Sequence, residues 1–99
     1  FDWATRGGAR ALKDHGATGT LEIGGPADLV LLDPLAPNLR PVIDGFGIVV
    51  HSGAGSNVTD VMVAGEWVVR DRRPVRVDIE EVIAEAQRVS EALWHRAPA

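Results

Sequence analysis

The side chains best suited to hold a metal ion in this sequence are its three histidines, His15, His51 and His95. No two of them are two or four residues apart, the spacings that place two imidazoles on one face of a strand or helix. A single metal could still gather all three in space. We favour surface or loop positions for them, and His95 would also suit the C-terminal end of a helix electrostatically.

A glycine-rich stretch directly follows the second histidine. Residues 53–58 read GAGSNV, which begins like a phosphate-binding glycine loop. The third glycine is missing, and neither a long preceding strand nor a following helix is convincing, so we favour a plain loop. Ser52 and Ser56 lie close to His51, but proximity in sequence does not create the geometry of a catalytic triad.

Four arginines fall within seven residues: Arg70, Arg72, Arg73 and Arg76, with Asp71 between them. Such a cluster of guanidinium groups could contact phosphate or nucleic acid. No aromatic residue is interleaved, and the chain as a whole carries a net charge of -4. The cluster is therefore better interpreted as the solvated exit of a hairpin.

The other polar and aromatic candidates are explained by structure. Asp28 and Asp33 bracket an apolar run, and capping or turn formation suits them better than acid–base chemistry. The three tryptophans (Trp3, Trp67 and Trp94) are better packing anchors than a ligand cage. We therefore assign no catalytic, cofactor-binding or metal-binding residue to this chain.

Composition narrows the class of protein further. The 99 residues, 45% of them hydrophobic, describe one small domain or part of a larger one. A domain with its own substrate cavity usually needs about 150 residues or more. The absence of cysteine excludes disulfides, thiolate zinc sites and a cysteine nucleophile. The acidic charge argues against nucleic acid, and apolar runs of at most four residues argue against the membrane. We expect a cytoplasmic protein.

Local signals predict a helix over residues 2–16, with Asp2 as its N-cap and Gly16 as its stop. The Gly7-Gly8 pair inside this helix indicates that it lies against a large neighbour. A short strand is expected over 20–23, followed by a turn at 24–26. Residues 27–33 form a continuous apolar strand, typical of one covered on both faces, which Pro34 ends.

The second half of the chain contains the clearest patterns. Residues 34–47 form an ordered connection, residues 48–51 are either a strand or one turn of helix, and residues 53–57 form a loop. Residues 58–70 form a hairpin whose turn, Ala64-Gly65, needs a positive φ at the glycine alone. A long helix follows Asp78, its N-cap, with Glu81 at the third position. Its apolar stripe comprises Ile79, Val82, Ile83, Ala86, Val89 and Leu93.

These few short strands cannot close both faces of a sandwich by themselves. The residues alone therefore suggest a fragment, or a subunit that completes its core against another chain.

Five segments in order carry a family resemblance: residues 4–12, 19–24, 27–33, 49–58 and 61–69. Together they resemble the end of a metal-dependent amidohydrolase. The last two resemble the branch of triazine hydrolases and aminohydrolases, which includes chlorohydrolases and nucleoside or S-adenosylhomocysteine deaminases. The resemblance extends over almost the whole chain.

The resemblance implies an α+β fragment of a (β/α)₈ TIM-barrel enzyme, divided into three parts. Residues 1–16 would be the helix that follows the last barrel strand. Residues 17–77 would belong to a composite β-sandwich shared with the N-terminus of the enzyme, and residues 78–97 would be a C-terminal helix packed back on the barrel. Two turns depart from the family pattern: Gly24-Gly25 replaces glycine-lysine, and Ala64-Gly65 replaces Asn-Gly.

The family's metal ligands are a His-x-His pair, two later histidines and an aspartate, and none maps onto this chain. We expect the chain to begin after that aspartate, so zinc or iron is implied for the parent enzyme only. The expected function is a structural part of a hydrolase acting on non-peptide C–N bonds or on amino or chloro ring substituents through a metal-activated hydroxide.

Two kinds of partner follow from this hypothesis. One is the remainder of the amidohydrolase, which would provide the barrel, the N-terminal sandwich strands and the small-molecule substrate; the other is a second copy of the chain. The alternative hypothesis is a small autonomous α+β interaction module that dimerises through its C-terminal helix.

Overall fold

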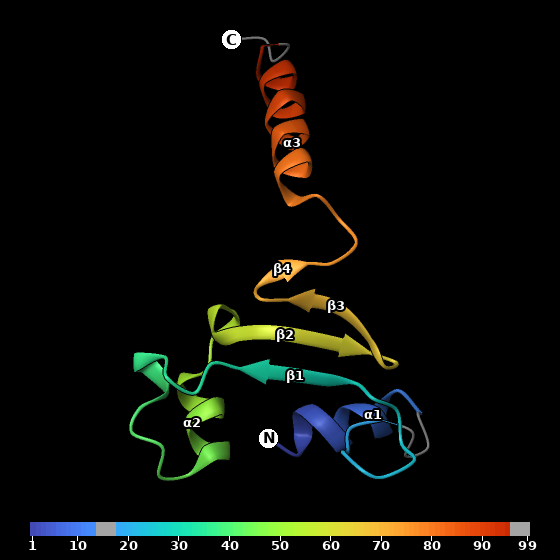
Figure 1. The fold of residues 1–99 in the computed structure, drawn as a ribbon, viewed down its shortest axis with the longest axis vertical. Coiled ribbons are helices and arrows are strands. Elements are labelled where there is room, and N and C mark those ends of the chain that lie inside the picture. Colours follow the sequence, from blue (N-terminus) through green and yellow to red (C-terminus); the bar gives the residue numbers. More distant parts are fainter. Residues whose placement is uncertain (14–17, 96–99) are drawn as a thin grey trace.

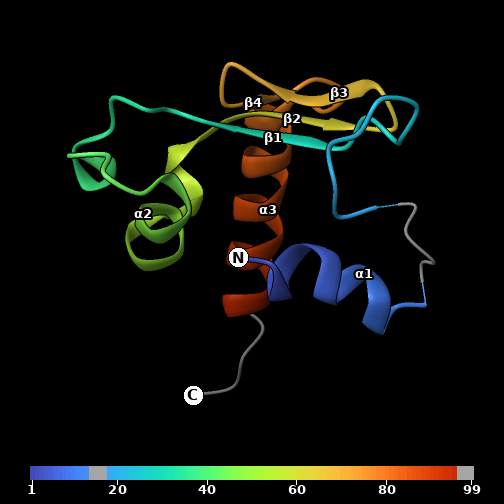
Figure 2. The same ribbon diagram turned by 90° about the horizontal axis from the view of Figure 1, so that it is seen from below.

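A four-stranded antiparallel sheet, in the order β1-β2-β3-β4, organises the computed structural model, which describes residues 1–13 and 18–95. In Figure 1, helices α1 and α2 lie beyond the β1 edge of the sheet, near opposite ends of its strands, and α3 projects beyond the β4 edge. Figure 2 shows all three helices extending to the same side of the sheet plane. The strands are β1 (Leu29–Leu32), β2 (Val58–Val63), β3 (Glu66–Arg70) and β4 (Arg73–Pro74). The helices are α1 (Gly8–Ala11), α2 (Gly45–Ser52) and α3 (Ile79–Trp94).

The first helix differs from its prediction at both ends. It begins as a π-helical segment, η1 (Trp3–Gly7), and continues as α1 to Ala11. Asp2 is not a side-chain cap, because its own backbone is already helical and its carbonyl accepts a hydrogen bond from Gly7 N at 2.9 Å. Its carboxylate instead lies near Arg6 and Arg10. The predicted stop at Gly16 lies outside the described residues.

The strand predicted over residues 20–23 is wrong. Two turns enclose this segment, one at Gly19 (φ +87°) and one in which Gly25 N donates to Glu22 O at 3.1 Å. A Cβ at Gly19 would lie 2.9 Å from the backbone of Thr5 and Arg6, so the chain can cross η1 this closely only at a glycine. The predicted turn at 24–26 is confirmed, with Gly24 at φ +86°.

The strand predicted over 27–33 is confirmed as β1, and the predicted hairpin as β2 and β3. The β2–β3 turn is a two-residue turn in which both residues have positive φ, Ala64 at +50° and Gly65 at +83°. The prediction that glycine alone would need a positive φ is therefore wrong, because the type I′ geometry that matches strand twist requires it at both positions. A second turn of the same kind, Asp71-Arg72, leads into the unpredicted β4.

The connection between β1 and β2 is ordered. It contains a 3₁₀ turn, η2 (Pro37–Leu39), then α2, then a second 3₁₀ turn, η3 (Gly55–Asn57). Residues 48–51, for which the sequence leaves strand and helix open, are helical. Asp44 caps α2, because its carboxylate accepts a hydrogen bond from Phe46 N at 3.1 Å. The rings of Phe1 and Phe46 lie 4.9 Å apart and bring the N-terminus against α2.

The long helix α3 begins where predicted. The Asp78 carboxylate accepts a hydrogen bond from Glu81 N at 3.1 Å, which confirms Asp78 as the N-cap. No helix within the described residues is long and apolar enough to cross a membrane. The chain is thus a small α+β structure built around one antiparallel sheet, as predicted at this level.

Candidate functional site: a polar network and an uncovered apolar surface

The described histidines lie on separate elements and are exposed. His51 belongs to the last turn of α2, and His95 follows α3, where its backbone N–H donates to Glu91 O at 3.0 Å. His15 lies outside the described residues. Among residues 1–13 and 18–95, no three histidine, aspartate or glutamate side chains are grouped so as to hold a metal ion.

The glycine-rich stretch folds around a buried asparagine. Asn57 is 3% exposed, and its side-chain oxygen accepts from Ala54 N and from Asn38 Nδ2, both at 2.8 Å. Asn57 Nδ2 donates in return to Asn38 Oδ1 at 2.9 Å, and Asn38 Nδ2 also donates to Ser52 O at 2.7 Å. The loop is therefore fastened to η2 by a reciprocal pair of amides, and Ala54 N already has a partner.

Arg72 ties the same loop to the end of β1. Its guanidinium lies 3.0 Å from Asp33 Oδ2 and donates to the backbone carbonyls of Ser56 and Val58. Asp33 N donates to Asn57 O at 2.8 Å, which links the two sets of contacts. We call Asp33, Asn38, Asn57 and Arg72 the polar network.

The contacts of the network bear on two chemical hypotheses, a catalytic triad at Ser52 or Ser56 and acid–base chemistry at Asp33. Ser52 and Ser56 contribute backbone carbonyls to it, beside an exposed His51, and this is not a triad arrangement. Asp33 also accepts from Leu35 N at 2.9 Å, so it forms the turn that its position before Pro34 predicts.

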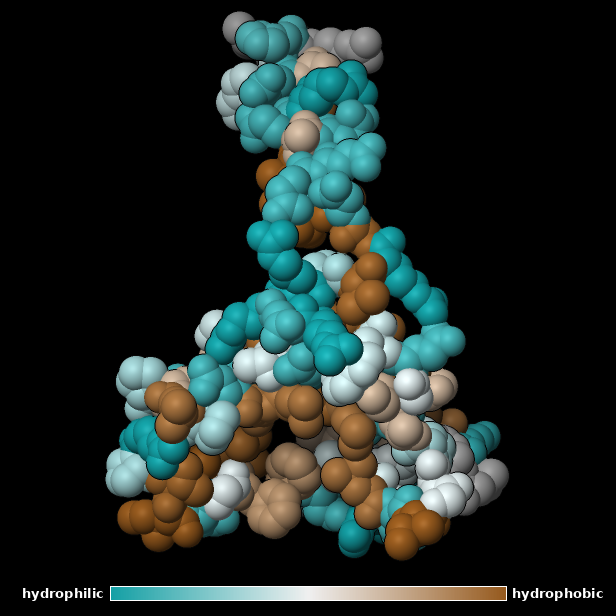
Figure 3. Space-filling model, viewed as in Figure 1, coloured by the Kyte–Doolittle hydropathy of each residue, from teal (hydrophilic) through white to brown (hydrophobic). Residues whose placement is uncertain are grey.

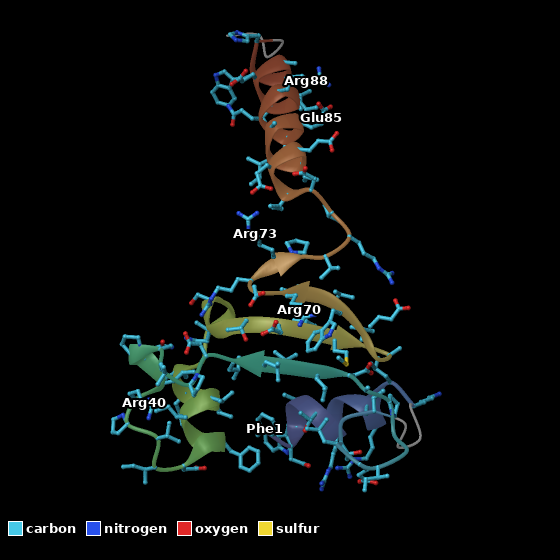
Figure 4. The ribbon with its side chains drawn as sticks, in the orientation of Figure 1. Phe1, Arg40, Arg70, Arg73, Glu85 and Arg88 are labelled. Carbon is cyan, nitrogen blue, oxygen red and sulfur yellow. The ribbon has the colours of Figure 1, made fainter. Side chains whose placement is uncertain are left out.

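The other three arginines of the cluster also contact protein groups. Arg70 lies over the Trp67 ring at 5.5 Å, Arg73 pairs with Glu80 at 3.1 Å, and Arg76 pairs with Glu66. Figure 4 shows Arg73 below the start of α3, next to β4. The cluster therefore holds the end of the hairpin together and joins it to α3, in keeping with its interpretation as a hairpin exit.

Within residues 1–13 and 18–95, hydrogen bonds shift the pKa of three ionisable groups. The Thr59 side chain and the Asp71 backbone N–H lower the pKa of Asp60, and the charges of Arg70 and Arg72 lower it further. On α3, the Arg88 side chain lowers the pKa of Glu85, and Glu85 in turn raises the pKa of Arg88 (Figure 4). All three groups lie at the surface and support structure.

Much of the apolar surface is uncovered in the described part of the chain. Its buried residues are Ala9, Leu39 and Asn57. Val30 and Leu31 of β1 are 60% and 44% exposed, so the cover predicted on both faces of this strand is not found among the described residues. Figure 3 shows apolar side chains around a hollow below β1 and again at the base of α3.

The stripe of α3 is equally open. Its exposed members are Val82 at 49%, Ile83 at 61%, Val89 at 42% and Leu93 at 62%. No α3 residue is buried. Neighbouring exposed apolar side chains of this kind are typical of surfaces that pack against another protein surface.

Sequence reasoning missed Asn38 and Asn57. Both lie among turn-forming residues, where asparagine is common and gives no signal of its own. Their pairing spans 19 residues, and no local pattern reports such a contact. The one available signal is an asparagine at the end of an apolar, proline-rich connection, where a buried amide can satisfy backbone groups.

Known proteins are similar to this chain in sequence and in fold. The Amidohydrolase family matches residues 1–68. A 5-methylthioadenosine/S-adenosylhomocysteine deaminase of Nitratidesulfovibrio vulgaris (strain DP4) is 37% identical over 88 residues, which are 89% of this chain and 20% of that protein. A 5'-deoxyadenosine deaminase of Methanosarcina mazei is 38% identical over 93 residues, 94% of this chain and 21% of that protein.

Two solved structures are similar over most of the chain. An adenosine deaminase from Xanthomonas campestris with bound zinc has a TM-score of 0.84 and 30% identity, covering 95% of this chain and 21% of that one. Atrazine chlorohydrolase from Arthrobacter aurescens, complexed with zinc, has a TM-score of 0.71 and 30% identity, covering 87% and 19%. The chain thus spans about a fifth of the length of the proteins it matches.

Proposed function

This chain belongs to the amidohydrolase family, and we propose that it is a structural part of a larger hydrolase that acts on C–N bonds or on amino or chloro substituents of a ring. The named activities of its relatives, deaminases and a chlorohydrolase, support this substrate class. Their length supports the larger size, because the chain corresponds to about a fifth of each relative.

The observation that carries the proposal is the contrast between the two edges of the sheet. The β4 edge is unsuited to pairing, since the strand consists of only Arg73 and Pro74 and is followed closely by Arg76. The β1 edge has four apolar residues and neither a charge nor a proline. Exposed edges of that kind invite pairing, so β1 is suited to receive a strand from the rest of the enzyme.

In the proposed assembly the three segments have separate structural roles. Residues 1–16, whose described part is helical from Trp3 to Ala11, would follow the last strand of a (β/α)₈ barrel. Residues 17–77 would contribute the observed sheet to a composite β-sandwich, and residues 78–97, which contain α3, would pack back on the barrel. Each segment presents an apolar surface that such contacts would cover, including Trp3, Val30 and Ile83.

The metal of the proposed hydrolase is assigned to residues outside this chain. Two structural neighbours contain zinc. The described histidines of this chain do not fit such an ion, because they lie on separate elements without grouped carboxylates. A zinc or iron ion that activates water for hydrolysis would therefore be held elsewhere in the polypeptide.

The first experiment is the intact mass of the polypeptide that carries this sequence in its host. The proposal expects a mass several-fold above the 10.6 kDa of these 99 residues. We call that molecule the complete polypeptide. A mass of 10.6 kDa, with no barrel-bearing partner recovered in the same complex, would contradict the proposal.

The second experiment separates a structural role from a catalytic one. In the complete polypeptide, His51→Ala and His95→Ala should leave the metal content and kcat of deamination unchanged. Both residues are exposed, and among the described residues neither belongs to a group of side chains that could hold a metal ion. Loss of bound metal in either variant, with the fold retained, would show that this chain contributes a ligand.

The uncovered stripe of α3 supports one rival function, an autonomous module that dimerises through this helix. Sedimentation of the 99-residue chain distinguishes the two. A stable dimer that loses its self-association on Ile83→Asp would favour the module, whereas weak, irregular association would favour the hydrolase part.

A further inference from the structure

Both tight turns of the sheet are held from a neighbouring strand by the same set of contacts. At the β2–β3 turn, Ala64 N donates to Asp28 Oδ1 at 2.7 Å and Gly65 N donates to Ala27 O at 3.1 Å. The two acceptors are consecutive residues at the entrance to β1, the strand paired with β2.

The β3–β4 turn repeats this arrangement one strand further along the sheet. Asp71 N donates to Asp60 Oδ1 at 3.1 Å, and Arg72 N donates to Thr59 O at 2.8 Å. Here too the acceptors are consecutive and the second is an aspartate. In each case the carboxylate accepts a hydrogen bond from the N–H of the first turn residue. The backbone carbonyl of the residue before the aspartate accepts one from the N–H of the second turn residue.

A physical need explains the repetition. In a two-residue type I′ turn the N–H groups of both turn residues lack partners within the hairpin. The preceding strand of an antiparallel sheet passes beside the turn and can accept from both. A short side chain with an acceptor oxygen, such as aspartate, suits this position because that oxygen reaches past the end of the regular ladder to the first turn N–H. The backbone carbonyl of the preceding residue already lies within reach of the second.

We propose that residues 27–28 and 59–60 are two matching clasps that fix the register of the sheet, with Asp28 and Asp60 as their positioning residues. Each clasp fits one alignment of its strand, because a slip of one residue replaces the aspartate and turns its side chain to the other face. The Asp28 clasp also fixes how β1 enters the sheet, and hence the position of its open edge. This inference does not depend on the proposed hydrolase function.

The clasps further account for an unusual residue in the first turn. Ala64 has a φ of +50°, a conformation that glycine or asparagine adopts more readily. The Asp28 contact holds this residue from outside the turn, so alanine is tolerated there.

The test is hydrogen exchange on the complete polypeptide, resolved to single residues by mass spectrometry with fragmentation. Asp28→Ala should speed exchange at Ala64 about tenfold and leave Asp71 unchanged, since one hydrogen bond is lost locally. Asp60→Ala should do the reverse. Asp44→Ala, which removes the cap of α2, is the matched control and should leave both turns protected.

The conservative variants keep the proposal testable if an alanine variant fails to fold. Asp28→Asn retains an acceptor oxygen at the same place and should preserve the protection of Ala64, whereas Asp28→Glu retains the charge but displaces the acceptor and should lose it. Equal behaviour of the asparagine and glutamate variants would overturn the clasp. So would an Asp28→Ala variant in which exchange at Ala64 does not change, or one that stays folded and in which both turns change together.

Discussion

The polar network finds its hydrogen-bond partners within this chain, whereas the apolar stripe of helix α3 finds no covering surface among the described residues. In the network, Asn57 is buried, and both polar atoms of its side chain form hydrogen bonds with other residues of this chain. In α3, the cap and the Glu85–Arg88 pair are internal, but the apolar stripe touches no covering surface among the described residues. Among the described residues, the buried polar side chains therefore find their partners within the chain, whereas the apolar side chains of α3 do not.

This difference indicates which interactions the chain can supply by itself. Hydrogen bonds and caps are formed between nearby segments, and within the described residues no buried side-chain polar atom lacks a partner. Apolar burial needs an opposing surface of comparable area, which a sheet of four short strands does not provide. The contrast is what we expect of a structural part of a larger enzyme.

The largest effect is expected when a charge is placed on the α3 stripe. In the complete polypeptide, Ile83→Asp should lower the free energy of unfolding by about 3–5 kcal/mol, because an unpaired charge would be buried against the covering surface. Ala84→Asp, on the opposite face of the helix, is the control and should change stability little. The measurement is chemical denaturation. If both variants had equally small effects, the stripe would be exposed in the complete polypeptide as well. Helix α3 would then not need a covering surface, and its contrast with the polar network would be contradicted.

A smaller loss is expected in the polar network. Asn57→Ala should cost about 2–3 kcal/mol, because it leaves Ala54 N and the Asn38 amide without their buried partner. Gln87→Ala is the control on α3, where an exposed amide away from the apolar stripe donates to Glu91 Oε1 at 2.7 Å, and it should stay within about 0.5 kcal/mol. Thermal unfolding of both variants checks this. An Asn57→Ala variant as stable as the control would show that the network does not hold the loop.

The turn at Ala64 offers a stabilising change. Ala64→Gly should raise the free energy of unfolding by about 1 kcal/mol, because it removes the strain of a positive φ. Ala36→Gly is the matched control, since Ala36 has an ordinary φ of -58° and should lose stability. Unfolding curves of the two variants should move in opposite directions. Movement in the same direction would contradict the observed turn.

The smallest effect is pH-dependent and concerns Asp60. Because its folded-state pKa is lowered by Thr59 and the Asp71 N–H, its carboxylate stabilises the fold above the unfolded pKa of about 4. That contribution should decline below about pH 4 and vanish as the pH falls through the folded pKa. Asp60→Asn should show a shallower loss of stability over this window. An identical pH profile for both proteins would exclude the contribution.

Elements specified by nearby residues could be predicted from sequence, and elements specified by distant contacts could not. Helix α3 was predictable because Asp78, Glu81 and the apolar stripe are all local. Strand β4 was missed because it has two residues, one of them proline, and pairs only through an unexpected turn. The strand over 20–23 was wrong because η1 and two glycine turns, not β-propensity, decide its path.

The candidate site follows the same rule. The absence of a metal-ligand spacing was visible in the positions of the three histidines. The Asn38–Asn57 pair and the Asp28 clasp join residues 19 and 36 positions apart, so only the folded chain brings them together. The family resemblance made part of the long-range structure predictable, because five motifs in a fixed order indicate a known fold, which no single motif does.

The most direct test of the central claim compares the isolated 99 residues with the complete polypeptide in urea, with a hydrophobic dye as a second probe. Our account predicts that the isolated chain binds the dye and unfolds gradually, while the complete polypeptide excludes the dye and unfolds cooperatively. A sharp two-state transition of the isolated chain, without dye binding, would show that its apolar burial is self-contained and would contradict the account.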